Sequence, residues 1–174
     1  MSELKPIYGY GFFNVRESGL VDETIVFLYS DPEAYYKRIM RDRSKYAREI
    51  EMLSRNMQYF LDEEKVYINN ERVYPILGRV DIGVAGLDNI AYIIFNIYFK
   101  GVLKKGLNTY VNEYEQETSE YDYTVYWLFP ENARIVNAVL NVPYEVILYG
   151  RGLRFTVYRG TRLPGREEII FEVN

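Results

Sequence analysis

From residue 66 onward the chain alternates short segments of β-forming residues with turn signals, and this succession constrains the fold most. The turns are marked by KKG, PEN, NVP, GRG and LPG. Many short strands at regular spacing predict an antiparallel β-sandwich or barrel. The segment IAYIIFNIYF (90–99) is apolar on both faces, which is typical of a central buried strand. Two further strands are expected at 8–17 and 20–30.

One of these segments, VYINNERVYPI (66–76), predicts a hairpin with Asn69–Asn70 at its turn, because asparagine tolerates positive φ. The glycine-rich segment GRVDIGVAG (78–86) is interpreted as a connection between strands. A phosphate-binding loop is not indicated there, since no Gly-Lys-Ser/Thr and no helical pattern follow it.

Between residues 31 and 65 the hydrophobic period changes from that of a strand to that of a helix. Ser30–Asp31–Pro32–Glu33 has the order of a helix start, and no glycine or proline follows before Lys65. Apolar residues form one stripe: Ile39, Tyr46, Leu53 and Phe60 at intervals of seven, with Tyr36, Ile50 and Met57 beside them. We therefore predict one long helix, about 31–65, inserted after the second strand, with a break near residues 54–56 as the alternative. The expected fold is α+β, mainly β, in a single domain, 1–174.

The chain of 174 residues contains no cysteine and no histidine. Disulfides, thiolate nucleophiles, imidazole bases and histidine-ligated metals are thereby excluded. Most common hydrolase and metalloenzyme designs need one of these groups, so we expect a non-enzymatic protein with no cofactor and no metal site.

The N-terminus lacks the order of a signal peptide, no apolar run approaches the ~20 residues of a membrane span, and no Asn-x-Ser/Thr sequon occurs. We expect a soluble cytoplasmic protein with no membrane association. The absence of cysteine and the scarcity of glutamine fit a thermophilic source.

The predicted helix has cations in its first half and anions in its second half. The cations are Lys37, Arg38, Arg41, Arg43, Lys45 and Arg48, and the anions are Glu49, Glu51, Asp62, Glu63 and Glu64. Such a helix matches a copy of itself running antiparallel. The candidate self-association residues are Tyr36, Ile39, Arg41, Arg43, Tyr46, Arg48, Ile50, Leu53, Met57 and Phe60. The alternative is that the apolar stripe packs on the protein's own sheet.

The C-terminal third is rich in arginine, whose planar guanidinium binds carboxylate and phosphate groups. The candidate anion patch consists of Arg151, Arg154, Arg159 and Arg162. With a net charge of −4, nucleic acid is an unlikely partner for the whole chain. We favour an alternative in which these arginines lie beside the acidic segment 113–122 and pair with it.

The segment 108–133 combines acids and tyrosines with the only tryptophan and contains no lysine or arginine until Arg134. Its simplest interpretation is a pair of strands with one solvated face, with Tyr121, Tyr123, Val125, Trp127 and Phe129 pointing inward. A ligand surface of Glu113, Tyr114, Glu115 and Tyr126 is the second interpretation, with carbohydrate as its ligand. A catalytic carboxylate pair of the kind found in glycosidases is the third.

Together these patterns favour an interaction or structural protein that presents its charge-split helix and arginine-rich edge to a protein partner or to a second copy of itself. A carbohydrate-binding sandwich is the alternative function, and a glycosidase the third.

Overall fold

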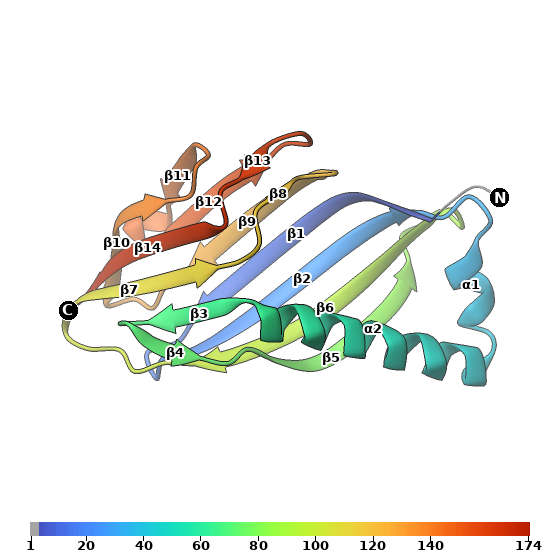
Figure 1. Ribbon diagram of the computed structural model, residues 1–174, viewed down its shortest axis with the longest axis horizontal. Coiled ribbons are helices and arrows are strands. Elements are labelled where there is room, and N and C mark those ends of the chain that lie inside the picture. The colour runs from blue at the N-terminus through green and yellow to red at the C-terminus, as the bar shows by residue number, and fades with distance from the viewer. Residues whose placement is uncertain (1–3) are drawn as a thin grey trace.

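The computed structural model describes residues 4–174, and most of its strands form two sheets packed face to face (Figure 1). Sheet A has the spatial order β11 (Tyr144–Ile147), β12 (Gly152–Val157), β9 (Asp122–Leu128), β1 (Lys5–Val15), β2 (Leu20–Ser30), β6 (Ile90–Lys100) and β5 (Ile76–Val84). Sheet B has the order β10 (Ala133–Val139), β14 (Arg166–Val173), β7 (Gly106–Glu113), β3 (Lys65–Ile68) and β4 (Glu71–Val73). A small ribbon pairs β8 (Glu117–Thr118) with β13 (Arg162–Leu163), and a 3-10 turn, η1, spans Leu148–Gly150.

The predicted mainly β sandwich is confirmed, and its sheets stay open, so it is not a barrel. One strand pair departs from the antiparallel expectation. Strands β1 and β9 run parallel, with Tyr8 opposite Asp122 and Asn14 opposite Leu128. These strands are more than a hundred residues apart in the chain, and the strand pattern alone does not define such a distant pairing.

The predicted hairpin at residues 66–76 is also confirmed, as strands β3 and β4. Asn69 and Asn70 join the strands with φ values of 53° and 67°. Two consecutive left-handed residues form the turn whose twist matches that of the strands. The Asn69 side chain also accepts a hydrogen bond from the Thr109 amide at 3.0 Å, which attaches the turn to β7.

The predicted long helix is divided into two, and this corrects the expectation of one element at 31–65. Helix α1 spans Tyr35–Ile39 and helix α2 spans Arg43–Glu63, so the break lies at residues 40–42 and not near 54–56. Asp42 adopts an extended conformation, and its carboxylate accepts hydrogen bonds from the Ser44 and Lys45 amides, both at 3.1 Å. An aspartate cap can begin a new helix in a segment that contains no glycine or proline, so the absence of these residues did not mean that the helix was continuous.

Two hydrophobic cores lie on the inner face of sheet A. The first fills the space between the sheets and includes Trp127, which is 4% exposed and stacks on Phe13 at 4.1 Å, as the predicted inward face of 121–129 requires. The second lies between the helices and strands β5 and β6, and includes Ile93 and Phe95. Sheet B therefore covers one half of sheet A, and the two helices cover the other half (Figure 1).

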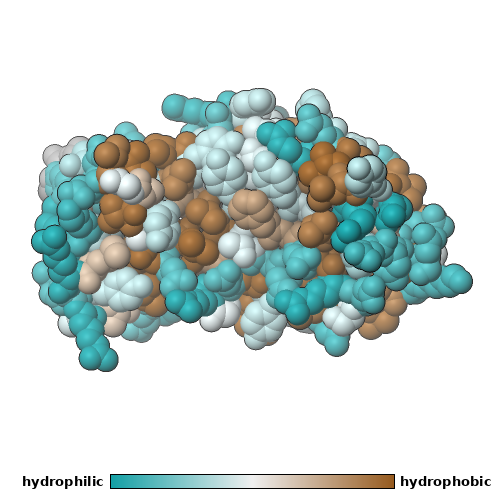
Figure 2. All heavy atoms as spheres, turned by 180° about the vertical axis from the view of Figure 1, so that it is seen from behind, coloured by the Kyte–Doolittle hydropathy of each residue, from teal (hydrophilic) through white to brown (hydrophobic). Residues whose placement is uncertain are grey.

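The outer face of sheet A is not covered by another element. Figure 2, which shows the molecule from behind, has hydrophobic and weakly polar side chains between hydrophilic margins on this face. Strand β6 is buried only on its inner face, since Tyr92, Ile94 and Asn96 on the outer face are half-buried. Among the described residues, none of the helices has both the length and the apolar character needed to cross a bilayer.

Candidate functional site

The apolar stripe of the predicted helix lies against the protein's own sheet. Tyr36 and Ile39 of α1 are buried, and four stripe residues of α2 pack on the second core: Tyr46, Ile50, Leu53 and Met57. Leu61 completes the buried face of α2, whereas Phe60, predicted to belong to the stripe, is 61% exposed. Residues that cover the sheet cannot also form a contact with a second copy.

The opposite face of α2 carries a second regular row, which we call the outer ridge. It consists of Lys45, Arg48, Met52, Arg55, Tyr59 and Asp62, all of them exposed. The intervals alternate between three and four residues, which is the spacing of a coiled-coil seam. Along this row cations come first, Met52 lies near the middle, and an exposed tyrosine and a carboxylate come last.

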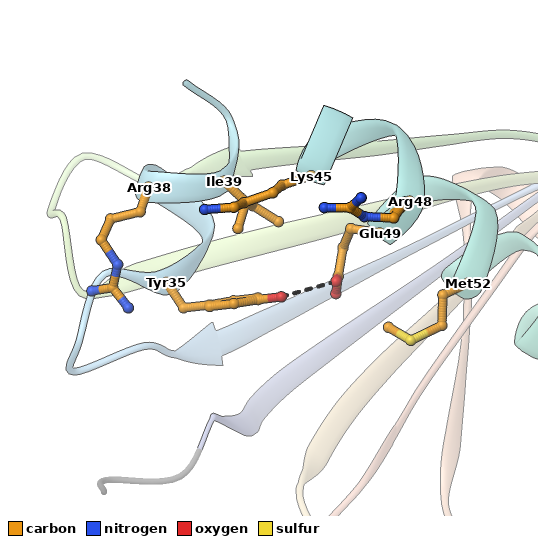
Figure 3. A pocket seen from close by; sticks show the side chains of 7 residues that line it. All are labelled: Tyr35, Arg38, Ile39, Lys45, Arg48, Glu49 and Met52. Carbon is orange, nitrogen blue, oxygen red and sulfur yellow. Dashed lines mark hydrogen bonds between the residues drawn. The ribbon is translucent and has the colours of Figure 1, made fainter. Parts of the chain in front are cut away.

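A hollow of about 480 Å³ lies beside the basic end of this ridge, between α1 and α2 (Figure 3). Tyr35 and Glu49 form its floor, and the Tyr35 hydroxyl donates a hydrogen bond to Glu49 at 3.1 Å. Tyr36 donates a second bond to Glu49 at 3.3 Å. Burial and the neighbouring Glu49 carboxylate raise the pKa of Tyr36 well above its usual range, so both hydroxyls stay protonated and hold the two helices together.

Cations line the hollow, where the exposed side chains of Arg38, Lys45 and Arg48 lie around it (Figure 3). The Arg38 guanidinium donates a hydrogen bond to the Glu33 carbonyl. Within residues 4–174, Arg41, Arg43 and Arg48 take part in no ion pair, and Lys45 makes only a 3.6 Å contact with Asp42. These charges are therefore available to a partner. Met52, which also lines the hollow, and Met40, which follows α1, have exposed side chains.

The four predicted anion-patch arginines lie at separate points. The Arg151 guanidinium donates to the Phe129 carbonyl at 3.2 Å, and Arg154 contacts Glu145 at 3.4 Å and the Tyr126 hydroxyl at 3.3 Å. Arg162 donates to Gln116 at 3.5 Å, and Arg159 is exposed in the turn after β12. Strand pairing does bring the basic and acidic segments together, β13 with β8 and β14 with β7. The only ion pair that joins these paired strands within residues 4–174 is Arg166–Glu113, at 3.9 Å and half-exposed, so it is weak.

The four residues of the predicted ligand surface are not brought together. Glu113 lies on the outer face of sheet B, while the Tyr114 hydroxyl is buried between the sheets. Glu115 lies at the rim of a cleft beside α2. Tyr126 lies on the outer face of sheet A, where its ring stacks on Phe12 at 5.4 Å.

Three carboxylates in the interior were not expected from the sequence: Glu23 is buried, and Glu64 and Glu167 are half-buried. Glu23 of β2, Glu64 after α2 and Glu167 of β14 interact across the space between the two sheets. Burial and the neighbouring carboxylates raise the pKa of Glu23 to about 8 and that of Glu167 to about 7. A sequence signal existed, since Glu23 interrupts an apolar strand face made by Val21, Ile25 and Phe27.

No family model matches the chain, and no curated protein is similar to it in sequence. Among solved structures, the folded domain of Mycobacterium tuberculosis LppM is similar, with a TM-score of 0.46 and 7% identity over 97% of this chain and 90% of that one. A protein of Parabacteroides distasonis proposed to be a protease gives a TM-score of 0.36 at 8% identity, over 98% of this chain and 40% of that one. An aminopeptidase N family protein of Idiomarina loihiensis gives 0.40 at 5% identity, over 93% of this chain and 29% of that one. These TM-scores and identities are low, so the similarities do not bear on function.

Proposed function

We propose that the protein is a non-enzymatic interaction protein that forms a two-fold homodimer through the outer ridge of α2. The observation that carries this proposal is the order of side chains along the ridge. Lys45 and Arg48 occupy its first positions, Arg55 lies just past its middle, and Tyr59 and Asp62 occupy its last positions. An antiparallel copy therefore presents opposite charge at both ends of the contact.

The ridge is self-complementary in one antiparallel register. With the two-fold axis between Leu53 and Ser54, Lys45 of one copy lies opposite Asp62 of the other. Arg48 then lies opposite Tyr59, where a guanidinium stacks favourably on an aromatic face. Met52 lies opposite the aliphatic part of Arg55. Each of these contacts occurs twice, because the two-fold axis repeats it.

The hollow between α1 and α2 supports the same register. Tyr59 and Phe60 are 62% and 61% exposed, and an exposed aromatic pair on a helix is a typical anchor for a partner. In the proposed dimer these rings approach the hollow of the second copy, whose rim carries Arg38, Arg48 and Met52. The acidic Glu63 follows them to the basic start of the facing helix.

The proposed contact closes on itself, since an isologous two-fold interface uses the same surface on both copies. Helix α2 has 21 residues and is therefore about 31 Å long. One helix from each copy gives a small interface, so we expect a weak dimer that depends on concentration and salt.

Light scattering over a range of protein concentrations tests the proposal. At about 50 mM salt the mass should rise with concentration from 20.7 kDa toward twice that value, and at about 500 mM salt the rise should be weaker. A mass of one chain at every concentration and both salts would reject the dimer.

A matched pair of variants assigns the contact to the ridge. Lys45→Glu with Arg48→Glu should abolish the rise in mass, because it places an anion opposite Asp62 of the second copy and removes the guanidinium that lies opposite Tyr59. Lys104→Glu with Lys105→Glu makes the same change of net charge in the exposed loop between β6 and β7, away from α2, and should leave the dimer intact. Equal effects of the two variants would show that net charge, and not the ridge, controls association.

A second candidate function, carbohydrate binding, is favoured by the outer face of sheet A. The Tyr126 and Phe12 rings are nearly parallel, with an angle of 6° between them, and Phe12 is 43% exposed. Arg154 and Glu145 beside them provide planar hydrogen-bonding groups at the edge of this platform. Screening the wild-type protein and Phe12→Ala on a glycan array tests this candidate, which predicts binding that the variant loses.

A further inference from the structure

The two hydrophobic cores are separated by a polar seam. Glu23 points inward from β2, Glu64 follows the end of α2, and Glu167 points inward from β14 beside Asn112 of its neighbouring strand. Asn112 donates a hydrogen bond to Glu64 at 3.2 Å. Carboxylates are rarely buried without a cation or several donors, because leaving water destabilises the charged form. Burial of these carboxylates does not stabilise the fold, so we looked for a functional reason for their position.

The seam opens to solvent through a cleft of about 510 Å³, which is within the size range of small-molecule sites. Apolar and aromatic side chains line it on three sides, from strand β2, from the end of α2 and from the connection between β7 and β9. The lining residues are Glu23, Ile25, Phe27, Met57, Tyr59, Phe60, Leu61, Glu63, Glu64, Tyr114, Glu115, Glu117 and Tyr121. This set contains five glutamates and no lysine or arginine, so no cation in the lining offsets their negative charge.

A buried polar group in this cleft lacks a partner. Glu23 is 9% exposed, and none of residues 4–174 donates a hydrogen bond to its carboxyl group. The Tyr114 hydroxyl is buried and interacts with Glu167, so it is not open to a ligand in the cleft. Buried carboxyl groups are normally satisfied, and an unsatisfied one points to a missing partner such as a ligand.

The chemistry of the lining determines the class of ligand. A metal ion needs several oxygens converging on one point, and no such group of acidic side chains is found among the described residues. An anion is repelled by the glutamates. The faces of Phe27, Tyr114 and Tyr121 attract a cation through their π electrons, and the apolar floor favours a hydrocarbon body. An organic ammonium attached to an aromatic or alkyl group satisfies all of these features.

We infer that the cleft is a binding site for a small organic amine whose ammonium group is held by Glu23. Ile25, Phe27 and Met57 contact the apolar body of the ligand, and Glu64 adds negative charge beside the ammonium. An ammonium has three donors and no acceptor, which matches the two oxygens of a carboxylate. Glu23 lies inside the cleft and not on the outer ridge, whereas Tyr59 belongs to both surfaces, so substitutions at Glu23 test the cleft without changing the ridge.

Occupancy should depend on pH. Burial and the charges of Glu64 and Glu167 raise the pKa of Glu23 to about 8, so its carboxyl is largely protonated in the empty protein at neutral pH. The ammonium binds the ionised form better, and an alkyl amine keeps its own proton up to about pH 10. Affinity is therefore expected to rise between about pH 6 and about pH 8.5.

Isothermal titration with 4-phenylbutylamine as the probe tests the inference, with 4-phenyl-1-butanol as its neutral counterpart. The wild-type protein should bind the amine, more tightly at the higher pH, and bind the alcohol at least about tenfold more weakly, since a hydrogen bond between charged groups is stronger than one between neutral groups. Glu23→Gln should weaken amine binding by about tenfold or more. Glu131→Gln, an exposed site outside the cleft, should bind as the wild type does.

Three results would overturn the inference: no heat of binding at either pH, equal affinity for amine and alcohol, or undiminished amine affinity in Glu23→Gln. Thermal unfolding of each variant without ligand checks that the fold is retained. Because Glu23→Gln replaces a buried acid by a neutral amide of the same shape, we expect its Tm at pH 8 to be no lower than that of the wild type. Loss of amine binding with an unchanged light-scattering mass separates this site from the dimer contact.

Discussion

At the scale of single residues, Asn108 has a structural role that its position in an acidic, tyrosine-rich segment does not reveal. It is completely buried, and its amide makes four hydrogen bonds. Its oxygen accepts from the Asn69 side chain at 2.8 Å and the Lys104 amide at 2.9 Å, and its nitrogen donates to the Lys104 and Gly106 carbonyls at 2.7 and 2.9 Å. One side chain thus joins the β3–β4 turn to the loop before β7.

Asn108→Leu should lower the free energy of unfolding by about 2–4 kcal/mol, because it leaves several partly buried backbone groups without partners. Urea unfolding followed by the fluorescence of Trp127 measures this change. Asn14→Leu, at an exposed position on β1, should change stability by no more than about 0.5 kcal/mol. Equal effects of the two substitutions would mean that the Asn108 network contributes nothing specific.

Glu23 makes stability depend on pH. Its pKa rises from 4.5 in the unfolded chain to about 8 in the folded protein, so the folded state holds this proton more tightly. Between about pH 5 and about pH 8 the unfolded state binds fewer protons, and the free energy of unfolding therefore falls as the pH rises. Glu167, whose pKa rises to about 7, and Glu64, whose pKa is also raised by desolvation, act in the same direction.

Glu23→Gln should reduce this loss of stability without abolishing it, since Glu64 and Glu167 still titrate. The slope for one such group is at most about 1.4 kcal/mol per pH unit. Urea unfolding at pH intervals gives the slope for wild type and variant, with Glu131→Gln as a control that keeps the wild-type slope. A wild-type stability that rises from pH 5 to pH 8 would contradict the assignment.

At the scale of elements, the sequence predicts turns and strand faces, because residues close together in the chain determine them. The Asn69–Asn70 turn follows from the tolerance of asparagine for positive φ, and the inward row ending in Trp127 and Phe129 follows from strand alternation. The parallel pairing of β1 with β9 depends on contacts between residues far apart in the chain, which the hydrophobic pattern of a single strand does not predict. The division between α1 and α2 was missed because Asp42 caps a helix without a glycine or proline nearby.

The same scale explains why the candidate site was only partly predicted. Charge separation along the helix is visible in the sequence, but the apolar stripe predicted self-association through the face that packs on the sheet. The outer ridge repeats at the same intervals on the opposite side, with Met52 and Tyr59 among charges, and only the structure distinguishes the two faces. The amine cleft needed Glu23, Glu64 and Glu167 to meet from three distant segments.

The cap at Asp42 gives a prediction for helix α2. Asp42→Ala removes the acceptor for the Ser44 and Lys45 amides and should lower the free energy of unfolding by about 1 kcal/mol. Asp42→Asn should retain most of that stability, because asparagine caps helices about as well as aspartate. Thermal unfolding by circular dichroism compares the two variants, and equal losses would show that the charge of Asp42, not its cap, stabilises the helix.

At the scale of the whole molecule, the two halves of sheet A serve different purposes. Sheet B closes one half into the larger core, while the two helices cover the other half and turn the outer ridge of α2 toward solvent. The polar seam lies where these halves meet. The proposed contact with a second copy and the proposed amine cleft meet at the end of α2, where Tyr59 belongs to the outer ridge and also lines the cleft.

The most direct test of the proposed dimer is a charge-exchange experiment with two variants. One carries Lys45→Glu and Arg48→Glu, and the other carries Asp62→Lys and Glu63→Lys. Each variant alone places like charges opposite each other in the antiparallel register, so each should be monomeric. Mixing them in equal amounts restores opposite charges at both ends of the contact and should produce a heterodimer, measured as a rise in light-scattering mass at about 50 mM salt. A mixture that stays at the mass of one chain, while the wild type dimerises, would contradict pairing through the outer ridge.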